Sequence, residues 1–292
     1  MNYFYSFLIV IAIVSCKPAT NKTEDAIDYQ SIQTGEKEEV INSFDTVGEG
    51  LPIFYNMYLT VEMSTLFESA HAVFNQDLLN QPVKTSDYIT NSKKALNLGV
   101  YAVDLSYCRI FEQFEIAGRY FNSMQKLSEE LGIPADFFIN TSKRFEKNIN
   151  DRDSLIKIAN EVYFTTDNYL RENEQYGVAA QIILGGWIEA VHIASNVALY
   201  SKDPNIIERY ADQKYSLKNL LLMLSNYPED EVIKHYVKRL NAVDNIYSTF
   251  DFNLPADLNP DSSGARKLIN QALVKIRTIE KQVNAIRHEI ID

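Results

Sequence analysis

Two copies of the motif Glu-x-x-His are the residues of this sequence whose types and spacing could do chemistry. They run from Glu68 to His71 and from Glu189 to His192. Side chains three residues apart lie on the same face of a helix, so each motif can present a carboxylate and an imidazole together. Carboxylate and imidazole groups are ligands for iron, manganese and zinc. The sequence therefore offers Glu68, His71, Glu189 and His192 as candidate metal ligands.

This pair of motifs resembles the metal-binding pattern of ferritin-like carboxylate proteins, in which two such motifs and two further glutamates bind two metal ions. The resemblance implies a di-metal centre as the cofactor. The order of the helices differs, because here the first motif falls on the first expected helix. The competing interpretation is that Glu68 lies on an exposed face, while Glu189 and His192 satisfy other buried polar groups. We expect no cofactor and keep the di-metal centre as an alternative.

Asp104 is a second candidate for chemistry, since it lies in the apolar stretch GVYAVDLSYCRIF. Burial raises the pKa of a carboxyl group unless hydrogen bonds stabilise its charged form. Tyr101 and Tyr107 lie three residues to either side and are natural neighbours. Together with Trp187 and Glu189, these residues predict a ligand pocket between two apolar helices. The alternative is a buried structural hydrogen bond at Asp104 and a core position for Trp187.

The helix expected over Tyr176 to Tyr200 is apolar on nearly every side. Such a helix is either a membrane span or the central helix of a large core. Glu189 and His192 interrupt it, and membrane spans tolerate such groups poorly. We therefore expect a core helix.

The strings LGVY and LGGW each place glycine before an aromatic residue in an apolar helix. They predict that the two helices pack closely through Gly99, Gly185 and Gly186, with Tyr101 and Trp187 beside them. A further possibility is that a small apolar ligand binds around Gly185, Gly186 and Trp187.

Helical periodicity continues through the rest of the chain, and no run alternates as a strand would. Glycine (10) and proline (8) are scarce, which favours long elements with short connections. We expect an all-α fold, a multi-helix antiparallel bundle of about eight or nine helices in one large domain. The expected ranges are 52–74, 92–131 with a bend near Gly118, 135–148, 150–174, 176–200, 204–224, 230–250 and 262–290. Residues 203 and 262 or 263 are expected to cap their helices.

The N-terminal pattern predicts a signal peptide followed by a cysteine that is lipidated. Residues 4–14 are apolar over the length of a signal-peptide core, and Ser15-Cys16 follows. This resembles a bacterial lipobox, which implies cleavage before Cys16, acylation of Cys16 and anchoring in a membrane through its acyl chains. The residue after the cysteine is Lys17 rather than aspartate. By resemblance to the sorting of bacterial lipoproteins, this implies that the protein is delivered to the outer membrane. The expected divisions are 1–15 as signal peptide, 16–45 as lipidated N-terminus and polar tether, and 46–292 as the helical domain.

The phrases LNLGVYAVDLSYCRIF, EELGIP and LGGWIEAVHIAS resemble a family of all-helical bacterial envelope lipoproteins with no assigned activity. The resemblance implies a binding or scaffolding role in the cell envelope rather than an enzyme, and it carries over no catalytic residues. The partner would be an envelope protein or a small apolar ligand. A net charge of −11 argues against a nucleic-acid partner, whose phosphates need clustered Lys and Arg.

Overall fold

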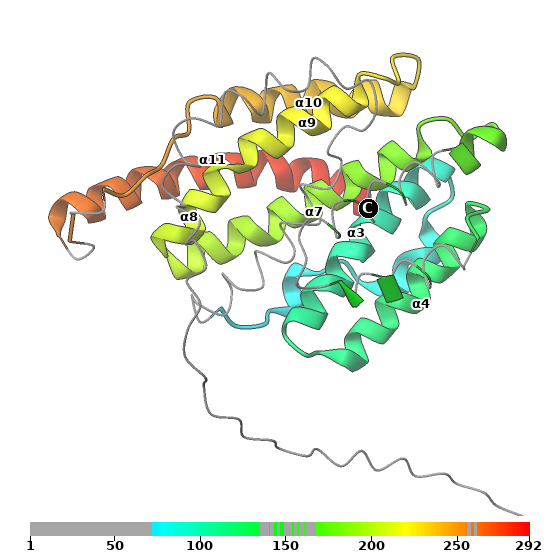
Figure 1. Ribbon diagram of the computed structural model, residues 1–292, viewed down its shortest axis with the longest axis horizontal. Coiled ribbons are helices and arrows are strands. Elements are labelled where there is room, and N and C mark those ends of the chain that lie inside the picture. Colours follow the sequence, from blue (N-terminus) through cyan, green and yellow to red (C-terminus); the bar gives the residue numbers. More distant parts are fainter. Residues whose placement is uncertain are drawn as a thin grey trace, which may run out of the picture. The chain divides into compact units, whose positions relative to one another are not determined.

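The computed structural model describes residues 72–134, 168–255, 258–259 and 262–292, together with single residues between 140 and 161. Within these ranges the chain is helical and contains no β-strand (Figure 1). The all-α, multi-helix fold expected from periodicity is therefore confirmed. The leader, the tether and most of the helices expected over 52–74, 135–148 and 150–174 lie outside the described residues.

The elements follow one another as two short 3-10 helices and a series of α-helices. They are η3 (Gln76–Leu78), η4 (Pro82–Asp87), α3 (Asn91–Ile110), α4 (Phe114–Glu130), α7 (Val178–Ser201), α8 (Pro204–Ala211), α9 (Gln213–Leu224), α10 (Glu231–Tyr247) and α11 (Ser263–Ile291). All of them belong to one compact unit, Glu49–Asp292. We call residues 75–88, which contain η3 and η4, the strap.

Side-chain caps set the start of several helices. Asp203 accepts hydrogen bonds from the backbone N–H groups of Asn205 and Ile206, and Pro204 occupies the first turn of α8. Ser262 accepts from the backbone N–H of Ala265 at the start of α11. Both caps satisfy N–H groups that have no partner inside the helix, as the sequence predicted.

Three expected helix limits are wrong. The predicted bend near Gly118 is absent, because α3 ends at Ile110 and α4 begins at Phe114. The chain turns there through Glu112, whose positive φ of 56° ends the helix, and the Gln113 N–H donates to the Cys108 carbonyl. The helix expected over 204–224 is divided into α8 and α9, and residues 72–75 are not helical.

The centre of the described core is α7, which lies between α3 and α11 (Figure 1). By length and composition alone, α7 is long and apolar enough to cross a membrane. About two thirds of its most apolar stretch is, however, buried against the rest of the chain. Its partner α11 carries an apolar stripe in which Leu273, Ile276, Ile279, Val283 and Ile286 are buried, whereas Leu268 is exposed. We therefore assign α7 as a core helix.

The helices α3 and α7 touch backbone to backbone at two glycines. A Cβ atom on Gly99 would lie 1.8 Å from the Ile182 carbonyl oxygen, and one on Gly185 would lie 1.9 Å from the Leu96 carbonyl oxygen. No side chain fits either place, so close approach explains both glycines. Tyr101 and Trp187 are fully buried nearby. The close packing predicted from LGVY and LGGW is confirmed.

We expect Gly99→Ala and Gly185→Ala each to lower the free energy of unfolding by about 1–3 kcal/mol or more, because the added methyl group must separate the helices. The measurement is urea unfolding followed by circular dichroism.

Gly118→Ala is the matched control, since Gly118 lies inside α4 with nothing within 4 Å of the added atom. Alanine has the higher helix propensity, so this variant should gain about 0.5–1 kcal/mol. Equal losses at all three positions would contradict the role given to the α3–α7 contact.

Candidate functional site

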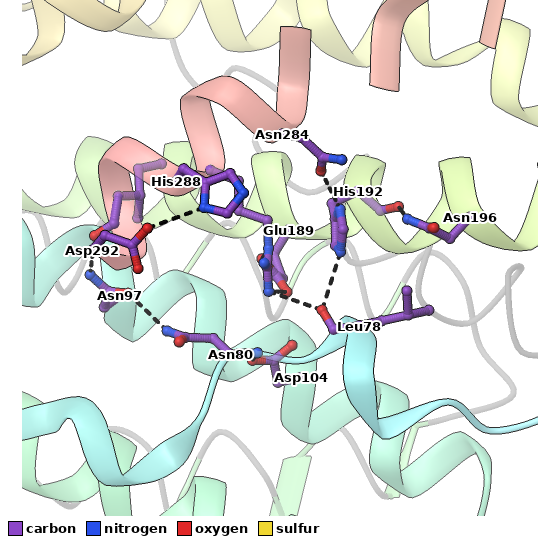
Figure 2. A network of polar contacts seen from close by, with 12 residues as sticks. Leu78, Asn80, Asn97, Asp104, Glu189, His192, Asn196, Asn284, His288 and Asp292 are labelled. Carbon is purple, nitrogen blue, oxygen red and sulfur yellow. Dashed lines mark hydrogen bonds and ion pairs between the residues drawn. The ribbon is translucent and has the colours of Figure 1, made fainter. Parts of the chain in front are cut away.

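A buried cluster of charged groups lies where the strap crosses α3, α7 and α11. Its members are Asp104, Glu189, His192 and Arg287, whose exposed fractions are 0%, 0%, 7% and 8%. Figure 2 shows Glu189 and His192 on α7 facing the strap carbonyl of Leu78, with Asp104 on α3 beside the strap. The helices that the two glycines bring together thus also bring these side chains together.

Glu189 and Arg287 form an ion pair with two hydrogen bonds. Arg287 Nε donates to Glu189 Oε2 over 2.5 Å, and Arg287 Nη2 donates to Oε1 over 2.7 Å. Nη2 also donates to the Leu78 carbonyl over 2.9 Å. Burial opposes the charge on Arg287, but the Glu189 carboxylate outweighs it and raises the arginine pKa. A buried charge needs such a partner, because neither ion has water to solvate it.

His192 also contacts the strap. Its Nε2 lies 3.2 Å from the Leu78 carbonyl oxygen, and its Nδ1 lies 2.6 Å from Asn284 Oδ1. Asn284 in turn donates through Nδ2 to Glu280, which fixes the amide with its oxygen toward His192. Burial lowers the pKa of His192, against the opposing effect of Glu189. A neutral imidazole carries one N–H, so His192 donates to only one of these two oxygens, and both neighbours belong to the same chain.

Asp104 completes the cluster from α3. Its Oδ2 accepts a hydrogen bond of 3.1 Å from the Asn80 N–H, whereas its Oδ1 is buried without a hydrogen-bond partner. Burial and the neighbouring negative charge of Glu189 raise the pKa of Asp104 well above its usual range, whereas Arg287 lowers it less.

The tyrosines expected beside Asp104 bind the strap backbone. The Tyr101 hydroxyl donates to the Gln81 carbonyl over 2.9 Å, and the Tyr107 hydroxyl accepts from the Asn75 N–H over 3.1 Å. Tyr120, on α4, donates to the Asn80 carbonyl over 2.8 Å. The strap is therefore held mainly through its own backbone groups, by side chains from four helices.

The residues of the predicted ligand pocket do not form one site. Asp104, Tyr101, Tyr107 and Glu189 lie around the strap, but the indole N–H of Trp187 donates to the Ser216 hydroxyl on α9 over 2.9 Å. Trp187 is 1% exposed and belongs to the core. The backbone of Leu96 fills the space at Gly185.

The candidate metal ligands divide between two parts of the chain. Glu68 and His71 lie outside the described residues. Within the described ranges, no group of three or more His, Cys, Asp or Glu side chains is placed to hold a metal ion. Arg287 engages both carboxylate oxygens of Glu189, and His192 faces two carbonyl oxygens. These two residues satisfy other buried polar groups, which was the competing interpretation of the motif.

Sequence reasoning missed the partners Arg287, Asn80 and Asn284. Arg287 stands four residues after Val283 and three before Ile290, both of which are buried. That spacing places an arginine on the apolar stripe of α11 and could have indicated a buried charge. Asn80 lies in a loop, and the sequence carries no signal for its position.

The core of the described part also contains a cysteine on α3. Cys108 is buried and free of any disulfide. Burial raises the pKa of its thiol to about 12. The thiolate is the reactive form, so Cys108 is a core side chain.

Comparison with protein-family models, with curated proteins and with solved structures finds no match to this chain.

We expect Arg287→Met to lower the free energy of unfolding by about 3–5 kcal/mol, because it leaves the Glu189 carboxylate buried without a counter-charge. The double variant Glu189→Gln/Arg287→Met should lose less than Arg287→Met alone. Urea unfolding of the single and double variants measures the coupling.

Arg119→Ala is the control. Arg119 pairs with Glu115 on α4, and their side chains are 62% and 85% exposed. Such surface pairs contribute about 0–1 kcal/mol. A double variant as unstable as the sum of its single variants would show that Glu189 and Arg287 are not coupled.

Proposed function

We propose that this chain is a lipid-anchored protein of the cell envelope whose helical body has a binding or scaffolding role. The proposal assigns no reaction to it. The observation that carries the anchor is the apolar leader ending at Cys16, with a polar tether of about 30 residues after it. Acylation of that cysteine would anchor the chain, since each buried methylene contributes about 0.8 kcal/mol.

The state of the titratable side chains supports binding over catalysis. A general acid, base or nucleophile must reach a substrate within hydrogen-bond distance. Asp104, Glu189 and His192 are buried, and each is bound to another part of the same chain. These three groups stabilise the fold, so a binding role would use the surface of the body.

That surface offers apolar side chains for a protein partner. Phe114 and Phe121 lie seven residues apart on α4 and are 68% and 41% exposed. Gly118 lies between them, with open space where a side chain would be. Exposed apolar groups that share one helix face favour a protein partner over a small ligand. The resemblance to envelope lipoproteins favours a partner in the same compartment.

Metabolic labelling with an alkyne fatty acid tests the anchor. We expect full-length protein expressed in a diderm bacterium to incorporate the label and to sediment with the outer membrane. Cys16→Ala should lose the label, because no thiol remains at the cleavage site. Cys108→Ala is the matched control and should keep it. Label that persists in Cys16→Ala would contradict the assignment.

Metal content separates this proposal from the di-metal alternative. We expect purified full-length protein to contain much less than one metal ion per chain by elemental mass spectrometry, because Arg287 already engages Glu189. Near-stoichiometric iron, manganese or zinc that is lost in both His71→Ala and Glu189→Ala would overturn it.

A further inference from the structure

The exposed side of α11 is basic, although the whole chain has a net charge of −11. Between Ser263 and Ile279 this helix contains no Asp or Glu. Four exposed cations, which we call the basic face, lie along it: Arg266, Lys267, Arg277 and Lys281. At about 100° per residue, they fall within a sector of about 100° around the helix axis, away from the buried stripe. The helix therefore presents positive charge along one side.

The basic face has no counter-charge in the described part of the chain. None of its four side chains makes a hydrogen bond or an ion pair with a described residue. Other exposed cations do find carboxylates, as Lys214 does at Asp251 and Arg239 does at Glu289. The basic face is therefore available to an anion from outside the chain.

An exposed apolar side chain lies among these charges. Val274 is 60% exposed, and it stands seven residues after Lys267 and seven before Lys281, so the three share one helix face. Free phosphate or a nucleic acid would offer the valine no apolar contact. The surface of a membrane offers phosphates to the cations and the edge of the acyl region to the valine. The combination favours a membrane that carries anionic phospholipids.

The length of the tether brings such a surface within reach. Residues 16–45 separate the proposed acyl anchor from the helical body. A flexible chain of about 30 residues has a root-mean-square end-to-end distance of about 30 Å. The basic face itself extends over about 22 Å of helix, from Arg266 to Lys281, at about 1.5 Å per residue. The anchored body can therefore touch the membrane along this helix.

We propose that the basic face of α11 is a second membrane contact, which docks the helical body on anionic phospholipid headgroups. The inference rests on the proposed acyl anchor, which supplies the neighbouring membrane. In this orientation α4, which lies on the other side of α3 and α7 from α11, is turned away from the lipid (Figure 1). Phe114 and Phe121 on α4 would then remain accessible to a protein partner.

Lysine acetylation of the full-length protein, followed by mass spectrometry, tests this contact without a variant. The protein is mixed with vesicles of phosphatidylcholine alone or of phosphatidylcholine with phosphatidylglycerol. We expect Lys267 and Lys281 to react at least about fivefold more slowly on the anionic vesicles, since each cation near such a surface strengthens binding by about that factor. Lys126, which is exposed on α4, should react equally on both. Equal rates at Lys267 and Lys281 on the two kinds of vesicle would overturn the proposal.

Two soluble anions separate the membrane from other sources of phosphate. Inorganic phosphate and duplex DNA are added to the protein on neutral vesicles, at the phosphate concentration of the anionic vesicles. Neither should protect Lys267 or Lys281, and protection equal to that on anionic vesicles would refute a membrane contact. Sedimentation with neutral vesicles reports the acyl anchor alone, so failure of the anchor and failure of the basic face are separate results.

The double variant Arg277→Gln/Lys281→Gln removes two cations from the basic face. We expect docking to weaken by about 25-fold, at about fivefold per cation, so that Lys267 reacts on anionic vesicles nearly as fast as on neutral ones. Arg119→Gln/Lys126→Gln is the matched control, because it removes the same charge from exposed positions on α4. It should keep the protection of Lys267. An equal loss in both double variants, or no loss in either, would contradict a contact made by α11.

Tryptophan fluorescence gives a readout of the apolar part of the contact. A tryptophan that leaves water for the headgroup region emits at shorter wavelength, so we expect Val274→Trp to show this shift on anionic vesicles and not on neutral ones. Phe121→Trp, at a position 41% exposed on α4, should show no difference between them. Identical spectra of Val274→Trp on both kinds of vesicle would show that the valine does not meet lipid and would count against the proposal.

Discussion

The contact between the backbones of α3 and α7 is the constraint on which the described structure depends. Because Gly99 and Gly185 have no side chains, the two helices approach until each meets a carbonyl oxygen of the other. At this separation the negative charge of Glu189 on α7 raises the pKa of Asp104 on α3, in addition to the effect of burial. A wider separation would admit water between the helices, and water would stabilise the charged form of Asp104. The close contact at the glycines thus keeps the Glu189 carboxylate away from water, and Arg287 supplies the opposite charge.

The buried cluster stabilises one irregular segment rather than presenting reactive groups. Extended segments such as Leu79 to Gln81 leave backbone N–H and C=O groups without partners inside their own element. Here the side chains of Asp104, Arg287 and Tyr120 supply those partners. The charge of Arg287 strengthens its bond to the Leu78 carbonyl, since hydrogen bonds to ions are about twice as strong as neutral ones. The polar interior therefore determines where the strap lies.

Local sequence patterns predicted the parts of this structure that local interactions decide. The caps at Asp203 and Ser262 and the glycine contact fall in this class, because each depends on a few neighbouring residues. The break between α3 and α4 was misplaced, since the left-handed conformation of Glu112 has no signature in its residue type. The cluster could be predicted only in part: Glu189 and Asp104 stand out in apolar helices. Their partner Arg287 is 98 residues away from Glu189 in sequence, and no periodicity reaches that far.

The 98 residues between Glu189 and Arg287 also mean that the two partners are synthesised at different times. A ribosome adds about 5–20 residues per second, so Arg287 emerges on the order of 5–20 s after Glu189. Until then α3 and α7 can form, but burying Glu189 between them would leave its charge without a counter-ion. Complete burial of Glu189 between α3 and α7 is therefore favoured only after α11 has been synthesised. A chain in this state stays accessible to chaperones until α11 has been synthesised.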